Sequence, residues 1–161
     1  MLRSLIGLAA ALAATTAFAQ SQKPTPLGVW DATGAFVGTL FEQGVVEITI
    51  NDTPVLFDFD PGGNFFSGQN TLVFTSNNCS GTPYVSANGL PARAVIAGGS
   101  FFYPTKVTQV QVSSGLTNPG LSSSFCSSGS PTPTYAGVAA QAALPKVTPP
   151  LCVSATHVRC Q

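Results

Sequence analysis

Apolar and polar side chains alternate along two neighbouring stretches of the chain, 46–51 and 55–59. Because successive side chains of a strand point to opposite faces, each stretch predicts a half-buried β-strand. The intervening residues favour a turn, which we expect at 52–53. That turn would place Ile50 opposite Val55 and would gather the apolar side chains of both stretches on one face. The two stretches therefore predict a central β-hairpin.

Turn residues separate further short apolar or alternating stretches. Residues 28–38 predict a tight hairpin whose turn is bracketed by Asp31 and Gly34. Trp30, the only tryptophan, is expected to anchor the core, since an indole buries a large apolar area. Turn signals at this spacing, with little helical periodicity, predict one all-β domain, an antiparallel sandwich-like or barrel-like fold. More strands are expected at 71–75, 84–85, 92–96, 101–103 and 106–112.

The composition changes after the last of these strands. The stretch 113–134 is rich in Ser, Gly and Pro and predicts a long loop. The alanine-rich stretch 135–144 fits either a short helix or a strand, and the β-rich remainder of the chain favours a strand. Residues 151–160 predict a final strand or a small disulfide ring.

An export signal is expected at the start of the chain. Residues 1–19 combine a positive start, an apolar run at 5–14 and a small-x-small site ending at Ala19. The apolar run is too short for an ordinary membrane span, and no later stretch is long enough, so no transmembrane segment is expected. Removal of the signal near Ala19 would leave a flexible leader, 20–27, and a folded domain, 28–161. The mature protein is then secreted or periplasmic, and the style of the signal is bacterial.

Charged residues are scarce. Six acidic and six basic residues make up 7% of the chain, against about 25% in an average soluble domain. Without a basic patch, no binding of nucleic acid or anionic lipid is expected. A surface of hydroxyl and amide groups gives little electrostatic repulsion between copies of the protein, so the composition is compatible with a homo-oligomer.

Four cysteines follow the signal: Cys79, Cys126, Cys152 and Cys160. An even number in an exported chain predicts two disulfides, for which three connectivities exist. We favour Cys79–Cys126 and Cys152–Cys160, because the second pair is close in sequence. A zinc site is the alternative, but tight Cys-x-x-Cys spacing is missing and the chain has one histidine. No metal and no cofactor are expected.

Residues suited to catalysis are few. His157 is the only imidazole, it lies inside the presumed second disulfide ring, and no Gly-x-Ser-x-Gly motif accompanies it. Asp58 and Asp60 share the polar face of a predicted strand, as on the solvated side of a hairpin. The stretch 58–64 is faintly similar to a calcium loop, but Gly62 stands at a ligand position and the closing glutamate is missing. No catalytic residue is predicted.

Adjacent aromatic residues are better candidates for a binding role. Two neighbours on a strand point to opposite faces, so one ring of each group could be exposed. An exposed ring on a polar surface could stack on a sugar or contact a partner protein. The candidates are Phe65, Phe66, Phe101, Phe102 and Tyr103.

Two short motifs resemble a known group of proteins. They are Asp-Ala-Thr-Gly-Ala-Phe-Val-Gly at 31–38 and Cys-Ser-Gly-Thr-Pro-Tyr at 79–84. The pair resembles a loosely defined, uncharacterised group of exported bacterial β-rich proteins, over residues 28–104. The resemblance implies a β-rich exported domain and transfers no catalytic residue.

These observations favour an exported, non-enzymatic binding or surface-interaction module, whose partner would be a surface protein or a glycan. The low charge also allows an alternative, a subunit of a fibre or appendage-like assembly. An exported hydrolase is the least favoured function, because the chain has a single histidine and scattered acids.

Overall fold

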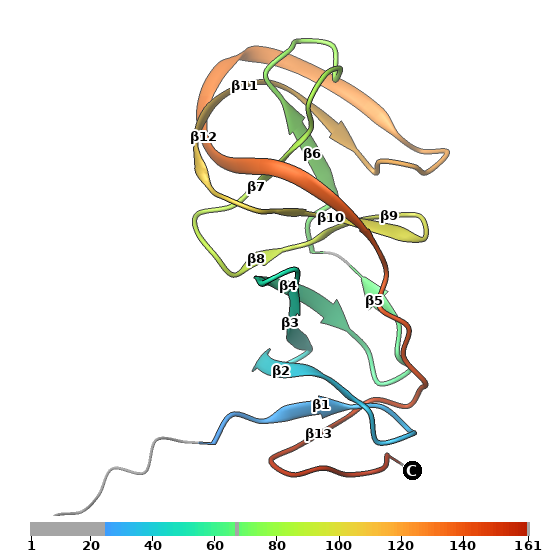
Figure 1. The fold of residues 1–161 in the computed structure, drawn as a ribbon. Coiled ribbons are helices and arrows are strands. Elements are labelled where there is room, and N and C mark those ends of the chain that lie inside the picture. Colours follow the sequence, from blue (N-terminus) through green and yellow to red (C-terminus); the bar gives the residue numbers. More distant parts are fainter. Residues whose placement is uncertain (1–24, 67, 161) are drawn as a thin grey trace, which may run out of the picture.

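The computed structural model describes residues 25–66 and 68–160. The expected signal peptide, 1–19, and the leader residues 20–24 lie outside this part of the chain. The described residues contain no helix and form two sheets, one above the other in the view of Figure 1. The predicted all-β fold, a sandwich or half-barrel of largely antiparallel strands, is confirmed.

The lower sheet in Figure 1 has the strand order β13-β1-β2-β3-β4-β5, and β8 pairs in parallel with β4. The first and last strands of the described chain are therefore neighbours. The strands of this sheet are β1 (Gly28–Trp30), β2 (Phe36–Glu42), β3 (Val45–Ile50), β4 (Thr53–Phe59), β5 (Phe65–Phe66), β8 (Ala92–Arg93) and β13 (Cys152–Ser154).

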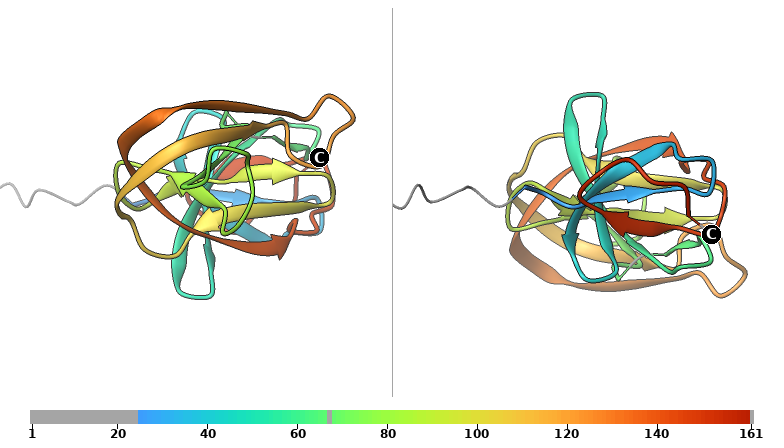
Figure 2. Two further views of the ribbon diagram at one scale, coloured as in Figure 1. Left: turned by 90° about the horizontal axis from the view of Figure 1, so that it is seen from above. Right: turned by 90° about the horizontal axis from the view of Figure 1, so that it is seen from below.

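The upper sheet has the order β11-β6-β7-β12-β10-β9, and β11 also pairs with β12. Seen from above in Figure 2, the β11–β12 hairpin curves around the other strands of this sheet. At Gly137 a Cβ atom would collide with the Lys106 carbonyl and the Pro104 side chain, so glycine lets β12 pass close to the corner between β10 and β11. The strands are β6 (Thr71–Phe74), β7 (Tyr84–Ser86), β9 (Val95–Ala97), β10 (Ser100–Pro104), β11 (Thr108–Thr117) and β12 (Phe125–Ala143).

The central hairpin forms as predicted, but with a different register. Ile50 pairs with Thr53 rather than Val55, because the turn consists of Asn51 and Asp52. Both turn residues have positive φ, 47° and 62°, the geometry that favours Asn and Asp in tight hairpins. The shift is two residues, so every apolar side chain keeps its predicted face.

The core lies where the two sheets meet. Val46, Val55 and Phe57 of the central hairpin pack against Phe101 and Tyr103 of β10. The rings of Phe57 and Phe101 meet edge to face, with their centroids 4.8 Å apart. Full burial of such a side chain contributes about 1.5–3 kcal/mol to stability. This contact therefore joins the sheets energetically as well as spatially.

The Ser/Pro-rich stretch 113–134 is not the predicted loop. Its ends belong to β11 and β12, which pair from Thr108 with Ala136 to Thr117 with Phe125, with a bulge after Val112. Nearly every side chain of β12 before Ala136 is exposed, so polar residues fill both of its faces. The composition reflects this exposure and not an irregular backbone. The predicted strand at 135–144 is confirmed as the end of β12.

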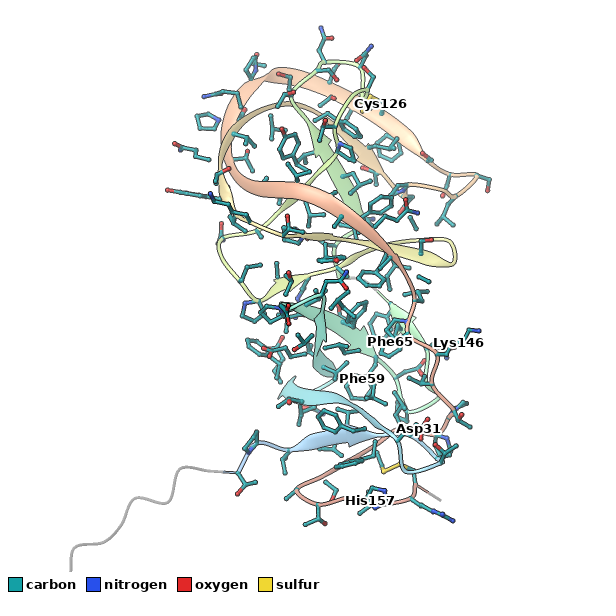
Figure 3. The ribbon with its side chains drawn as sticks, viewed as in Figure 1. Asp31, Phe59, Phe65, Cys126, Lys146 and His157 are labelled. Atoms are coloured by element: carbon teal, nitrogen blue, oxygen red, sulfur yellow. A yellow bond between two sulfur atoms is a disulfide. The ribbon has the colours of Figure 1, made fainter. Side chains whose placement is uncertain are left out.

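Both expected disulfides are present. Cys79–Cys126 ties the turn between β6 and β7 to the upper end of the β11–β12 hairpin, and Cys152–Cys160 closes a small C-terminal ring. The ring lies at the opposite end of the molecule from Cys126 (Figure 3). The pairing favoured from the sequence is therefore confirmed.

Trp30 does not anchor the core. It is half-buried, and its ring contacts Phe36 and His157, each with centroids 5.1 Å apart. The reason is its position on β1 next to the edge strand β13, away from the contact between the sheets. The central position belongs to Phe57 and Phe101.

Candidate ligand-binding cleft

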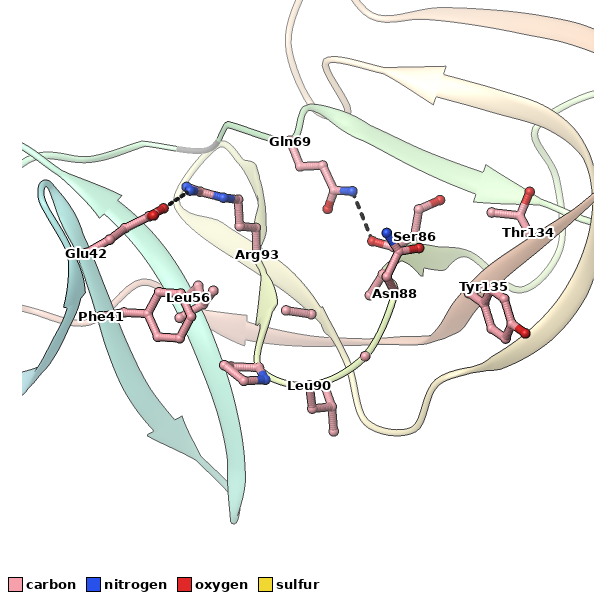
Figure 4. Close-up of a pocket in the computed structure, with 14 residues that line it drawn as sticks. Phe41, Glu42, Leu56, Gln69, Ser86, Asn88, Leu90, Arg93, Thr134 and Tyr135 are labelled. Carbon is pink, nitrogen blue, oxygen red and sulfur yellow. Dashed lines mark hydrogen bonds and ion pairs between the residues drawn. The ribbon is translucent and has the colours of Figure 1, made fainter.

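A cleft of about 580 Å³ opens where the two sheets meet. The end of β2 and the middle of β4 form one wall, and β12 forms the other (Figure 4). Residues 86–93, which run from the last residue of β7 through β8, form the base. The volume falls within the usual range for small-molecule sites, about 300–1,000 Å³.

Three exposed apolar side chains line the cleft. Phe41, Leu90 and Tyr135 are 53%, 44% and 55% exposed. Phe41 lies at a bulge in the pairing of β2 with β3, where the ladder skips from Leu40 to Glu42. Bulges redirect side chains, which accounts for a large ring that points to solvent. Phe41 and Tyr135 come from different sheets, so the cleft has an aromatic side chain on each wall.

The base of the cleft is polar. Gln69 donates a hydrogen bond from Nε2 to the carbonyl oxygen of Ser86, over 2.9 Å, and thereby ties the segment before β6 to the end of β7 (Figure 4). Asn88 is exposed on the connection from β7 to β8, and Thr134 lies on the β12 wall. Amides and hydroxyls both donate and accept hydrogen bonds, so this surface suits a ligand with mixed polar groups.

An ion-pair cluster borders the cleft. Arg93 donates from Nη2 to Glu42 Oε1 over 2.6 Å, and from Nη1 to Asp58 Oδ1. The second oxygen of Asp58 accepts a hydrogen bond from the backbone N–H of Gly68, over 2.8 Å. The hydrogen bond to Asp58 is the main cause that raises the pKa of Arg93, so the guanidinium stays charged. One cation therefore faces two carboxylates, and no positive charge is left over for an anionic ligand.

The predicted binding aromatics occupy different environments. Phe66 is half exposed and pairs with Asp58, so it lies on the same face as the ion-pair cluster. Phe65 is partly buried against Phe57. Phe102 packs on the second apolar cluster, formed by residues of β6, β7 and β9.

Phe101 and Tyr103 offer no aromatic surface to a ligand, because the central hairpin covers their side of β10. The sequence predicts the alternation along β10, but it does not show which face of the strand the hairpin covers.

The acids and the histidine weighed for catalysis lie apart. His157 contacts Trp30 at the base of the molecule, whereas Asp58 is held by Arg93. Asp60 accepts hydrogen bonds from the side chain and backbone of Asn64, over 2.9 Å and 3.0 Å, which lower its pKa. Asp60 thus closes a turn. Within residues 25–66 and 68–160, no group of three or more His, Cys, Asp or Glu could hold a metal ion.

The sequence pattern does not identify the residues that line the cleft. Phe41, Leu90 and Tyr135 belong to three separate segments that only the folded chain brings together. One signal was available: Asn-Gly-Leu-Pro at 88–91 is a strong turn sequence with an apolar residue inside it. An apolar side chain in such a turn is a candidate for an exposed contact.

The fold and the cleft define a class, an all-β protein stapled by two disulfides with a ligand-sized cleft between its sheets. Comparison with known proteins adds no family, since no family model, no curated protein and no solved structure matches the chain. None of the described residues belongs to a helix long and apolar enough to cross a membrane.

Proposed function

We propose that the protein is an exported, non-enzymatic binding module and that the cleft between its sheets is the ligand site. The observation that carries the proposal is the exposed apolar lining, Phe41, Leu90 and Tyr135, around a polar base. Keeping such side chains in water costs free energy that burial would recover, and a convergent set of them is typical of a binding surface.

The ion-pair cluster supports binding over catalysis. A general base must be able to take up a proton near the substrate. Glu42 and Asp58 both accept hydrogen bonds from the Arg93 guanidinium, so one oxygen of each carboxylate is already engaged. His157 lies at the lower end of the molecule (Figure 3) and does not line the cleft. The two carboxylates beside the cleft are thus engaged in ion pairs, an arrangement that supports recognition over proton transfer.

Export is supported by the disulfides. Both link cysteines that follow the expected signal peptide, and such bonds persist in oxidising compartments. The two bonds are compatible with a secreted or periplasmic protein. Production for any experiment should therefore pass through an oxidising compartment.

The test is to map ligand contacts on the mature chain from Gln20 by amide chemical shifts. The probes are a mixed set of neutral trisaccharides and capped tripeptides, both small enough for the cleft. We expect shifts confined to residues 86–93 and 134–135 and their neighbours. The double variant Phe41→Ala/Tyr135→Ala should lose at least about ten-fold in affinity, since each buried ring contributes about 1 kcal/mol or more.

Phe125→Ala is the matched control, because Phe125 is 56% exposed near the other end of β12, outside the cleft. It should leave the affinity unchanged. Shifts centred elsewhere, or an equal loss in the control, would reject the cleft as the ligand site.

A further inference from the structure

The cleft places its aromatic side chains where they could flank a flat ligand. Phe41 comes from β2 of the lower sheet and Tyr135 from β12 of the upper sheet, on opposite walls (Figure 4). Both are more than half exposed. An aromatic face stacks well against the C–H face of a sugar ring, and a phenol also keeps its hydroxyl in water.

The charges at the cleft further restrict the class of ligand that it could bind. Arg93 is bound on both sides by Glu42 and Asp58, so an anionic ligand would have to displace a carboxylate. Glu42 uses Oε1 for this pair, and its side chain is 53% exposed. This exposed carboxylate is a charged acceptor at the cleft, and hydroxyl groups are good donors to such an acceptor. The charges therefore suit a neutral ligand that carries hydroxyls.

The remaining polar groups match the same chemistry. Asn88 presents an amide, which both donates and accepts, and Thr134 presents a hydroxyl. Each sugar hydroxyl also donates and accepts. The cleft thus combines two aromatic walls with side-chain groups complementary to neighbouring hydroxyls.

A peptide strand fits the cleft less well. Extended peptides are commonly bound by adding a strand to a free sheet edge, through backbone hydrogen bonds. At this edge of β12 the carbonyl of Tyr135 already accepts a hydrogen bond from Ala87, over 2.9 Å. Two residues before it stands Pro133, which has no N–H to donate. The backbone beside the cleft could therefore form few hydrogen bonds with an added peptide strand.

Resting on the proposed function, we infer that the ligand is a neutral glycan, with sugar rings stacked on Phe41 and Tyr135 and hydroxyls bonded to Glu42 and Asn88. The affinity then comes from stacking and hydrogen bonds, with no attraction between net charges.

The experiment measures the affinity of the mature chain by calorimetry for single probes of matched size. The neutral probes are cellotriose, maltotriose, mannotriose and chitotriose; the others are trigalacturonate and a capped Ala-Pro-Ala peptide. We expect at least one neutral trisaccharide to bind, with the same affinity at about 50 mM and about 500 mM salt, because no net charge is matched.

Two substitutions separate stacking from simple apolar contact. Tyr135→Leu keeps apolar bulk but removes the ring, so it should weaken sugar binding about as much as Tyr135→Ala, by roughly ten-fold. Glu42→Gln should weaken binding by several-fold, since a charged acceptor becomes neutral. Phe125→Ala should bind like the wild type.

The outcomes distinguish this inference from the proposed function. Binding of the peptide or of trigalacturonate alone, with shifts at the cleft, would overturn the glycan assignment and leave the cleft as a ligand site. Full binding by Tyr135→Leu would also overturn it, because stacking would not be needed. Failure of every probe to perturb the cleft would count against both.

Discussion

Asp31 accepts four hydrogen bonds in a position that is 5% exposed. One carboxylate oxygen binds the hydroxyl and backbone N–H of Thr33 and the N–H of Ala35, over 2.6–2.9 Å. The other accepts from the N–H of Thr148, over 3.2 Å. The turn role of Asp31 follows from the sequence, whereas its bond to Thr148 joins segments too far apart in the chain to be predicted from turn chemistry.

Replacing Asp31 tests this network. These hydrogen bonds, led by the one from Thr33, hold the pKa of Asp31 below its ordinary value despite the opposing effect of burial. The unfolded chain therefore binds this proton more readily than the folded protein. The resulting stability is fully present above the unfolded pKa of about 3.9 and is lost as the pH falls through the folded pKa.

Asp31→Asn should lower the free energy of unfolding by about 1–3 kcal/mol at pH 7, because an amide cannot accept all four bonds. The difference from the wild type should shrink as the pH falls through the lowered pKa of folded Asp31, where the wild-type carboxyl itself becomes protonated. Urea unfolding followed by circular dichroism measures both values. Asp52→Asn, in the exposed hairpin turn, is the control. The expectation would be contradicted if the difference in free energy of unfolding between the wild type and Asp31→Asn stayed constant as the pH is lowered.

Among the elements, the central hairpin shows how far a sequence pattern reaches. Alternation predicts which side chains share a face, because that depends only on the period of a strand. The register depends on which two residues make the turn, and both 51–52 and 52–53 consist of residues that tolerate turns. The backbone settles on Asn51 and Asp52, which adopt positive φ and place Ile50 opposite Thr53.

Alternation along β12 also determines which of its backbone groups point away from β11, towards the outer edge of the strand. Tyr135 and Ala139 point their backbone groups towards β7, where they bond to Ala87 and Pro83 over 2.9 Å and 3.0 Å. The backbone of Pro133, two residues before Tyr135, faces the same side of β12. At that point β7 has already ended, so this side of the strand is a free edge. A missing N–H at a free edge hinders the addition of another strand. This edge therefore gives little support to the alternative of a fibre-like assembly.

Pro133→Val should increase self-association, because it restores an outward N–H on an exposed strand that has no charged residue. Thr132→Val adds a similar side chain on the same strand without adding an N–H, and it is the matched control. Light scattering over a concentration series should show a larger mean mass for Pro133→Val than for the control. Equal masses would mean that the proline does not protect the edge.

At the scale of the whole molecule, the two disulfides close loops of very different length. Their cysteines are separated by 47 and 8 residues. Loop-closure entropy assigns them about 4 and about 2.5 kcal/mol of stability. Removing Cys79 and Cys126 together as alanines should therefore lower the unfolding midpoint in guanidinium more than removing Cys152 and Cys160. The reverse order would indicate that the contact of the C-terminal ring with Trp30 outweighs the entropy of the long loop.

The cleft marks the limit of what the sequence could predict. Its walls come from β2, β4 and β12, and its base follows β7, so it exists only after the sheets are stacked. The parallel pairing of β8 with β4, which places Arg93 beside Asp58, connects segments with no shared turn. Local patterns specify strands and faces, whereas this contact depends on how distant strands meet.

The pairing of β1 with β13, which sets Gly28 opposite Ser154, has a practical consequence. Both ends of the described chain lie at the lower pole of the molecule in Figure 1, and neither end lines the cleft. A linker or an affinity tag at either end would therefore be attached at this pole and would leave the cleft open to solution. The same adjacency makes circular permutation feasible: a short bridge could join the old ends, and new ends could be opened at the exposed turn near Gly120.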